Sequence, residues 1–293
     1  MITDHKQQFL TKLRSIPVRN GHLDFISSLG VLIAGAEFKH SYEVEFKAWR
    51  KEIGKRRWHC VSLLDAKRQY LWHGGFEANS KILSELSKSL RGALENKCES
   101  DILYWSMRIL EWGEVYKGSV GYILNRYRDG ALGESILAAV AILEGEAYGA
   151  EKFDQKQLRM DSGLTKLYSL ASDRSVIMDS RVAAALSLVA TRVLETKSLP
   201  MARKLNAFAC GKSVSSEKKR SHIGGVKIFS PYLKPTNQAH YNLVTNWIIG
   251  EAILEAAERS DELHEMWKAD DDSGLFRAIE ASLFMVGSDI SGG

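Results

Sequence analysis

The stretch Leu158-Arg-Met-Asp-Ser-Gly-Leu-Thr-Lys-Leu-Tyr-Ser-Leu-Ala-Ser172, followed by Asp173-Arg-Ser-Val-Ile-Met-Asp-Ser-Arg-Val182, decides the fold of this sequence. Gly163 offers a turn position because glycine tolerates positive φ, and the apolar residues after it predict a short helix. The apolar run Val176-Ile-Met178 must be buried, and the charged Asp179 follows it directly. An apolar stripe then predicts a longer helix with one buried face, formed by Val182, Leu186, Val189 and Val193. The predicted order is helix, tight turn, short helix, extended link and helix.

The rest of the chain is also predicted to be mainly helical. Its four prolines stand at positions 17, 200, 231 and 235, so none interrupts residues 18–199. Helical periodicity of apolar residues covers residues 79–93, 101–112, 132–143 and 241–259. Asp101 stands where an N-cap is expected and Gly113 where a C-cap is expected. Short strands are expected only near residues 58–64 and 226–229.

Composition limits the class of protein. A chain of 293 residues can form one large domain or two lobes. No apolar run of about 18 residues predicts a membrane span, and the first residues contain no signal-peptide core, so we expect a cytoplasmic protein without a membrane partner. Three distant cysteines indicate neither a disulfide framework nor a zinc or iron–sulfur site, and the histidines lack metal-binding spacing, so we expect no metal and no cofactor. The net charge of +4 permits a phosphate-binding face.

Asp179 has two interpretations. It could be a plain N-cap, since aspartate is among the preferred capping residues. The helix dipole would also keep its carboxylate ionised. A fixed anion in a dry site is what cleavage of an N-glycosidic bond requires, because positive charge spreads over the sugar C1′ and O4′ as the base departs.

Gly163-Leu-Thr-Lys166, the apolar link and Met178-Asp-Ser-Arg-Val182 together resemble the helix-hairpin-helix DNA glycosylase superfamily, most closely its bacterial branch with the 8-oxoguanine-glycosylase fold. The segments Ile109-Leu-Glu-Trp-Gly113 and Ala239-His-Tyr-Asn-Leu-Val-Thr-Asn-Trp247 resemble further parts of that branch, so that the resemblance covers roughly residues 75–255. It implies a mainly α fold of two helical lobes with a helix-hairpin-helix element between them. The whole chain, residues 1–293, would form one glycosylase-like unit. Its parts would be an N-terminal helical region (1–125), the hairpin and Asp179 region (126–200), and a basic loop with the C-terminal helices (201–293).

The resemblance also implies roles for individual residues. Asp179 takes the position of the family's catalytic aspartate, and Lys166 that of the lysine which attacks C1′ to form a Schiff base in the bifunctional members. Two features depart from the family: Leu164 replaces the second glycine of the turn, and Lys166 lies closer to Asp179 than is usual. Lys166 could instead contact a phosphate or be solvated. Arg181 is expected to bind phosphate or to form a structural ion pair.

DNA contacts and a base pocket follow from the same resemblance. Ser162, Gly163 and Thr165 are expected to offer hydrogen-bond donors to a DNA phosphate. The loop at residues 211–235 carries six basic residues against one acidic residue, and Lys218, Lys219 and Arg220 are expected to follow the DNA backbone. Candidates for the pocket that receives a flipped base, each of which could instead pack in the core, are Trp112, Tyr168, His240, Tyr241 and Trp247.

The expected function is therefore removal of a modified base from double-stranded DNA by a monomeric DNA glycosylase, which leaves an abasic site. We favour a hypermodified base of phage DNA, such as glucosylated hydroxymethylcytosine, which would make the enzyme antiviral. Repair of 8-oxoguanine or of alkylated bases is the alternative, with or without lyase activity. Two non-enzymatic functions also fit the sequence: a DNA-binding protein of the same fold, and a helical interaction module in which Asp179 is only a cap.

Overall fold

The protein is mainly α-helical, as the sequence predicts. The structure, a computed structural model, describes residues 2–19, 21, 23–44, 51, 54, 57–116, 118–145, 149–154, 158–211, 217–229, 231–232 and 234–292, with the backbone alone for residues 2–3, 73, 210–211, 217–218 and 231–232. The α-helices within these residues are α1 (Ile2–Arg14), α2 (Phe25–Ile33), α4 (Leu63–Arg68), α5 (Phe76–Glu95), α6 (Glu99–Trp112), α7 (Ser119–Arg128), α8 (Leu132–Leu143), α9 (Leu164–Ala171), α10 (Ser180–Val193), α11 (Leu199–Lys204), α12 (Glu217–Ser221), α13 (Pro235–Ala257), α14 (Leu263–Trp267) and α15 (Asp272–Val286). Short 3₁₀ turns lie at η1 (Trp72–Gly74), η2 (Ala150–Lys152) and η3 (Thr196–Ser198).

Strands are few and short in the described part of the chain. β1 (His40–Glu43) pairs antiparallel with β2 (Arg57–Cys60), and His40 lies opposite Cys60. β4 (His222–Ile223) and β5 (Val226–Lys227) form a second antiparallel pair, and β3 (Cys210–Gly211) runs parallel to β6 (Pro231–Tyr232). Strands were therefore correctly predicted near residues 58–64 and 226–229, although each is shorter than expected. The expectation that strands occur only there was wrong, since β1, β3 and β6 lie elsewhere. None of the helices in the described ranges has the length and apolar character required to cross a membrane.

The predicted helices are confirmed by α5, α6, α8 and α13, and Gly113 is the C-cap of α6. The prediction that Asp101 caps α6 is wrong, because the N-cap is Cys98 and the helix begins at Glu99. Lys97 takes positive φ after α5, and the chain enters the next helix directly after this turn. The Glu99 carboxylate then accepts the backbone N–H groups of Leu132 and Gly133 at the start of α8. The first turn of α6 thus serves as a cap for another helix.

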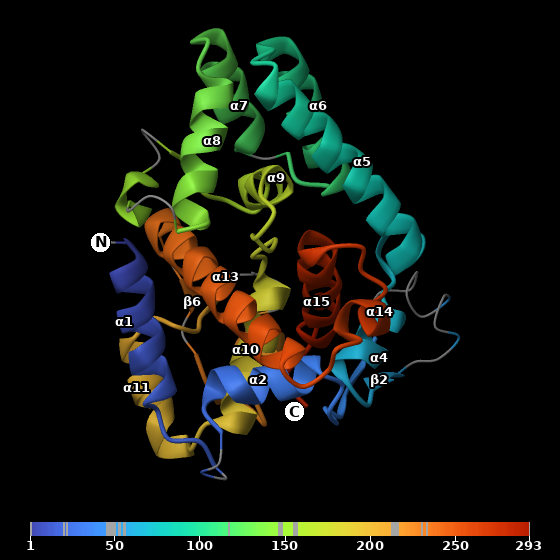
Figure 1. Cartoon of the computed structure of the whole chain (residues 1–293), viewed down its shortest axis with the longest axis vertical. Coiled ribbons are helices and arrows are strands. Elements are labelled where there is room, and N and C mark those ends of the chain that lie inside the picture. The colour runs from blue at the N-terminus through green and yellow to red at the C-terminus, as the bar shows by residue number, and fades with distance from the viewer. Residues whose placement is uncertain are drawn as a thin grey trace.

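Two clusters of buried hydrophobic side chains divide the molecule. The first core combines residues from both ends of the chain, from Leu10 to Tyr70 and from Val176 to Ile290. The second core is built from Leu83 to Leu170 together with Ala239. In Figure 1 the helices of the second core, α5 to α9, occupy the upper part, and the blue and red ends of the chain lie together below. The chain was expected to divide into three consecutive regions. The two cores do not match those regions, because the first core contains residues from both ends of the chain.

A short segment connects the two cores. The chain leaves α9 in the second core, passes through residues 172–179 without regular secondary structure, and enters α10 in the first core. We call residues 172–179 the link. The predicted order of short helix, extended link and longer helix is confirmed here. The helix expected before the tight turn is not formed, since residues 158–163 contain no helix, and Gly163 has φ −81°, so the turn does not use a positive φ there. Because the link ends at Asp179, this residue lies where the two cores meet.

Candidate functional site

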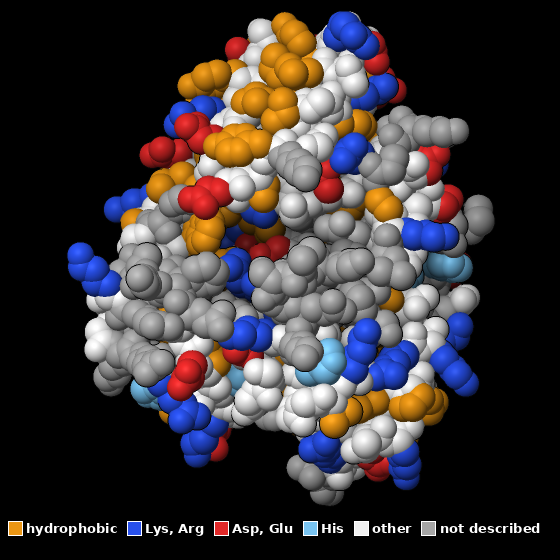
Figure 2. All heavy atoms as spheres, turned by 180° about the vertical axis from the view of Figure 1, so that it is seen from behind, with side chains coloured by type: hydrophobic (Ala, Val, Ile, Leu, Met, Phe, Trp, Pro, Cys, Tyr) orange, Lys and Arg blue, Asp and Glu red, His pale blue; other side chains and the backbone are white. Residues whose placement is uncertain are grey.

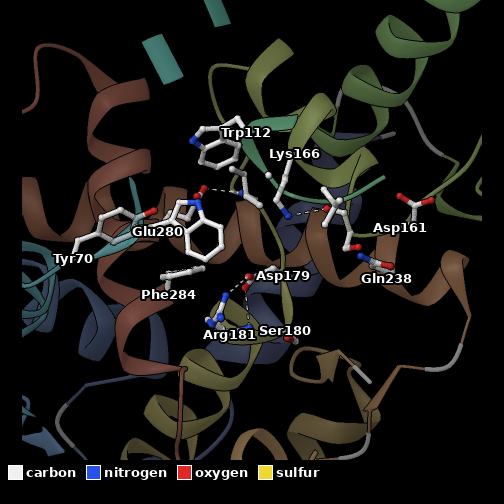
Figure 3. A pocket seen from close by; sticks show the side chains of 15 residues that line it. Tyr70, Trp112, Asp161, Lys166, Asp179, Ser180, Arg181, Gln238, Glu280 and Phe284 are labelled. Carbon is white, nitrogen blue, oxygen red and sulfur yellow. Dashed lines mark hydrogen bonds and ion pairs between the residues drawn. The ribbon is translucent and has the colours of Figure 1, made fainter. Parts of the chain in front are cut away.

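A cavity of about 380 Å³ lies at the junction of the two cores. This volume is within the range of small-molecule sites, roughly 300–1,000 Å³. Figure 2 shows the face seen from behind, with a hollow near its centre in which acidic and basic side chains are visible. Figure 3 shows the cavity from close by. Its lining residues are Tyr70, Trp72, Trp112, Gly113, Val115, Asp161, Ser162, Lys166, Ile177, Asp179, Ser180, Arg181, Gln238, Glu280 and Phe284.

The link is fixed by side chains of three different helices. Three successive backbone N–H groups of the link have no partner in a helix or sheet, and each donates to a side chain instead. Buried backbone N–H groups require such partners, so these contacts fix the path of the chain toward Asp179. The pairs are Val176 N to Asn246 Oδ1 of α13 at 3.0 Å, Ile177 N to Glu280 Oε2 of α15 at 2.7 Å, and Met178 N to Thr165 Oγ1 of α9 at 3.1 Å.

Asp179 is the N-cap of α10, as the sequence predicts. Its Oδ1 accepts the backbone N–H groups of Arg181 and Val182 at 2.8 and 3.0 Å. Its Oδ2 lies 3.8 Å from Arg181 Nη1, and the side chains of both residues are largely buried. The helix cap uses only Oδ1. Asp179 also lines the cavity, where Oδ2 remains outside the cap. An anion is thereby held at a helix N-terminus, where the dipole favours negative charge.

Lys166 of α9 lines the same cavity, although it is closer to Asp179 in the sequence than the family pattern has it. Its Nζ donates to the Ser162 carbonyl at 2.9 Å, across one turn of chain. Burial lowers the pKa of the Lys166 amine, while the negative charges of Asp179 and Glu280 oppose that shift. Gly113 makes room for the side chain, because a Cβ there would lie 2.4 Å from Lys166 Cδ. Lys166 is half-buried, and an amine with a lowered pKa in a cavity is a candidate nucleophile.

Aromatic side chains form one wall of the cavity, from Tyr70, Trp72, Trp112 and Phe284. Phe284 lies 5.6 Å from the Tyr70 ring and 5.9 Å from the Trp72 ring, centroid to centroid. Buried Asn79 holds two of them, since it accepts from Trp112 Nε1 at 2.9 Å and donates to the Tyr70 hydroxyl at 3.3 Å. The Arg181 guanidinium lies 4.4 Å from the Phe284 ring centroid, a cation–π contact that ties this wall to Asp179.

A second carboxylate, Glu280 on α15, reaches the cavity beside the aromatic wall (Figure 3). Its Oε2 accepts from Ile177 N and lies 2.7 Å from Arg277 Nη1. Burial raises the pKa of Glu280 to about 7, and the nearby negative charge of Asp179 adds to the shift, while Arg277 and Lys166 oppose it. The cavity thus holds three carboxylates in different surroundings: Asp179 and Asp161 accept N–H groups at helix N-termini, and Glu280 belongs to a buried ion pair. Carboxyl groups held in such different surroundings are typical of acid–base sites.

Five of the residues predicted from the sequence line the cavity, namely Asp179, Lys166, Ser162, Arg181 and Trp112. Arg181 faces Asp179 and Phe284, so in this structure it is part of the cavity wall. Ser162 is exposed at the rim and supplies the carbonyl for Lys166. These residues come from α6, from the turn before α9, from α9 and from the start of α10.

The expected phosphate donors at the hairpin are corrected by the structure in two cases. Gly163 N and Leu164 N both donate to Asp161 Oδ1 at 3.0 Å. Thr165 is fully buried, and its hydroxyl donates to Asn242 Oδ1 and accepts from Met178 N. The cause is Asp161, whose carboxylate occupies the N-terminus of α9 that a phosphate would otherwise use. Gly163 and Thr165 therefore build the turn and the link, and neither offers an exposed donor.

Four of the five expected pocket aromatics do not line the cavity. The Tyr168 hydroxyl donates to the Arg159 carbonyl, and its ring is buried in the second core. Tyr241 is buried in the first core. Trp247 packs 5.8 Å from the Phe9 ring, and His240, whose pKa is lowered by burial, lies 5.8 Å from the Tyr241 ring. Their apolar surfaces are used for packing, which is the usual role of large aromatic residues.

The basic segment reaches the cavity through one residue. Arg220 of α12 donates from Nη1 to the hydroxyl of Ser180, the cavity residue directly after Asp179. Lys219 forms an ion pair of 3.4 Å with Asp289 near the C-terminus. The side chain of Lys218 lies outside the described residues. Of the basic residues expected to follow DNA, Arg220 is thus adjacent to the candidate site.

Sequence reasoning missed Asp161, which lies beside the turn, and the cavity residues from other parts of the chain, namely Tyr70, Trp72, Gln238, Glu280 and Phe284. It also missed Asn242 and Asn246, which lie one helical turn apart on the buried face of α13 and hold the link. A signal existed for the asparagines, because two amides at this spacing in an apolar stripe require buried partners. Glu280 gave a similar signal, as a charged residue among the buried positions of α15.

Among the described residues, no group of three or more His, Cys, Asp and Glu side chains could hold a metal ion. Comparisons with family models, with curated proteins and with solved structures gave no match to this chain. The chemistry of the cavity is therefore inferred from its own residues.

Proposed function

We propose that this protein is a DNA glycosylase of the helix-hairpin-helix type, which receives a flipped modified base in the cavity between its two cores and cleaves the N-glycosidic bond. The observation that carries the proposal is that Asp179 and Lys166 line one cavity of nucleobase size together with four aromatic side chains. The turn before α9, the link and the Asp179 cap would form the helix-hairpin-helix element between two helical lobes. The protein would act as a cytoplasmic monomer on double-stranded DNA.

Asp179 has the setting that stabilises a departing base. When the C1′–N bond breaks, its electron pair leaves with the base and positive charge develops on the sugar. The Asp179 carboxylate is held by two backbone N–H groups and cannot turn away from the cavity without losing its cap. A fixed anion of this kind stabilises the transition state without reorganisation.

Lys166 supplies the nucleophile in this proposal. Its neutral amine would attack C1′, lose a proton and, after the sugar ring opens, form an imine with C1′. Hydrolysis of that imine releases an abasic site, and β-elimination from it cuts the strand. Burial, which lowers the pKa of Lys166, supports the role, since only the unprotonated amine has a free electron pair.

The aromatic wall and Arg220 support the choice of DNA as substrate. Enzymes that act on a base in duplex DNA take the nucleotide out of the stack and hold it between aromatic or apolar side chains. Trp112 and Tyr70, both fixed by Asn79, offer planar faces for such stacking. Arg220, beside Ser180, places a cation near the cavity, where it can meet a backbone phosphate.

A panel of duplex oligonucleotides tests the proposal. Each would carry one modified base: glucosylated hydroxymethylcytosine for the antiviral role, and 8-oxoguanine or 7-methylguanine for repair. We expect alkali-labile sites with at least one of them. Borohydride should trap a covalent protein–DNA adduct with wild type and with Lys197→Gln, an exposed lysine removed as a matched control, and not with Lys166→Gln. Salt-dependent DNA binding with no labile site on any substrate would contradict the proposal and favour a non-catalytic DNA-binding protein.

A further inference from the structure

Glu280 is a cavity carboxyl that the chemistry proposed so far does not use. It lies beside Tyr70 and Phe284, whereas Lys166 lies across the cavity from it (Figure 3). Asp179 is placed toward the start of α10, on the side of Arg181 and Ser180. A nucleotide held with its sugar at Lys166 and Asp179 would therefore direct its base toward the aromatic wall and Glu280.

The two oxygens of the Glu280 carboxyl have different surroundings. Oε2 accepts the Ile177 N–H and faces Arg277 Nη1, both at 2.7 Å. Oε1 has no hydrogen-bond partner among the described residues, and 12% of the side-chain surface remains exposed. Because Glu280 lines the cavity, Oε1 is the oxygen available to a bound molecule.

We propose that Glu280 is the general acid of this site, and that its Oε1–H protonates the departing base while Asp179 and Lys166 act on the sugar. This inference rests on the proposed glycosylase function and adds a residue to it. It also defines the substrate: a base that leaves as an anion unless it is protonated, and that presents a carbonyl oxygen or a ring nitrogen toward the aromatic wall.

The charges around Glu280 allow it to hold a proton near neutral pH. Burial is the largest influence and favours the protonated form, as does Asp179 of α10. Arg277 on the same helix, the hydrogen bond from Ile177 N and Lys166 of α9 favour the ionised form. The pKa of Glu280 is raised to about 7 as a result. Two other groups face this region. Arg181 forms an ion pair with Asp179, and the pKa of Tyr70 is raised by burial and by the charges of Glu280 and Asp179. General acids are most effective when their pKa is near the working pH.

The step balances with groups that are present. The C1′–N bond breaks, its electron pair goes to the base, and the Glu280 proton moves to an acceptor atom of the base. Glu280 is left as a carboxylate, which Arg277 stabilises across 2.7 Å. The Lys166 amine then bonds to C1′ and releases one proton, which restores the acid form of Glu280 directly or through water. No oxidant, reductant or further reactant is required.

Single-turnover base release, measured from about pH 5 to about pH 9, tests the inference with the panel oligonucleotide that wild type cuts fastest. We expect the wild-type profile to bend downward near the pKa of Glu280. Glu280→Gln should lower the rate at the acid end by at least about 100-fold and remove the bend. The isosteric amide can still accept the Ile177 N–H, and circular dichroism with a melting curve checks that it folds.

Arg277→Gln is the matched control, because it breaks the same buried pair and keeps the acid. We expect it to move the bend to higher pH, since Arg277 lowers the pKa of Glu280, whereas Glu280→Gln removes the bend. Unchanged release by Glu280→Gln, or equal losses in both variants, would overturn the role of Glu280 and leave the glycosylase proposal intact. If wild type releases no base from any oligonucleotide, the glycosylase function itself is wrong and the inference is rejected with it.

Discussion

Replacing Asp179 by asparagine or by alanine separates two roles of one carboxylate. The Asp179 side chain caps α10 through Oδ1, which accepts from Arg181 N and Val182 N. In the proposed reaction it also supplies negative charge to the cavity. Asparagine keeps an oxygen for the cap and removes the charge, whereas alanine removes both.

The two variants should differ in stability and agree in activity. Asparagine caps about as well as aspartate, so Asp179→Asn loses only the interaction of the charge with the helix dipole and with Arg181, about 1 kcal/mol. Asp179→Ala also loses the cap, about 1 kcal/mol more, or roughly 2 °C further in Tm for a chain of this size. Base release should fall by about 10²–10³-fold in both, because both lack the anion.

Thermal melting and single-turnover base release at one pH give the two quantities. Asp271 is the control, since it caps α15 by accepting Gly274 N at 2.7 Å and does not line the cavity. Asp271→Ala should lose about 1 kcal/mol of stability and none of the base release. If Asp179→Asn releases base at the wild-type rate, the carboxylate is only a helix cap and the reasoning is refuted.

Three further predictions concern the groups around Asp179. Gly113→Ala should cut the yield of borohydride-trapped adduct at least about tenfold with little change in Tm, because a Cβ at Gly113 would lie 2.4 Å from Lys166 Cδ and displace that side chain. An unchanged yield would show that adduct formation does not depend on the space that Gly113 leaves for Lys166. Asn246→Ala should lower the free energy of unfolding by about 3 kcal/mol in a denaturant titration, because it leaves the buried Val176 N–H, the Leu143 carbonyl and the Ser175 hydroxyl without this partner. A loss below about 1 kcal/mol would show that Asn246 does not hold the link. Folding raises the pKa of Glu280 from 4.5 to about 7. Protonated Glu280 therefore contributes about 3 kcal/mol to the free energy of unfolding below pH 4.5, and this contribution is lost as the pH rises through 7. Unfolding titrations should show this loss in wild type and not in Glu280→Gln, and equal pH slopes would contradict the raised pKa.

The local features around Asp179 were predictable from the sequence. The first four N–H groups of a helix have no partner within it, so a charged residue between an apolar run and an amphipathic stripe is expected to cap them. This reasoning predicts both the start of α10 and Asp179 as its N-cap. Gly113 as the C-cap of α6 was predictable for the same reason. Such features depend on contacts a few residues apart, which a single sequence displays directly.

The remainder of the site depends on contacts between distant parts of the chain. Ile177 and Glu280 are 103 positions apart, and their hydrogen bond exists only because α15 packs against α10. Nothing near Glu280 in the sequence specifies that partner. The aromatic residues show the same limit, since burial in the core and exposure to a cavity both require an apolar ring. Tyr168 and Trp112 therefore look alike in the sequence, although only Trp112 reaches the cavity.

At the turn before α9, an acidic side chain of the protein occupies an N–H group that the motif predicted for a DNA phosphate. Asp161, two residues before Gly163, accepts the Gly163 N–H, which was expected to bind a phosphate, and also the Leu164 N–H. A short acidic side chain ahead of a helix is always a candidate cap.

The measurement that tests the central proposal most directly is the identity of the base released from DNA. Wild type and Asp179→Asn would be incubated with cellular DNA and with glucosylated phage DNA, and the small molecules freed would be identified by mass spectrometry. The account predicts one modified base, in amounts equal to the abasic sites formed, from wild type and a strongly reduced amount from Asp179→Asn. Absence of any free base from all DNAs, or equal release by both proteins, would contradict it.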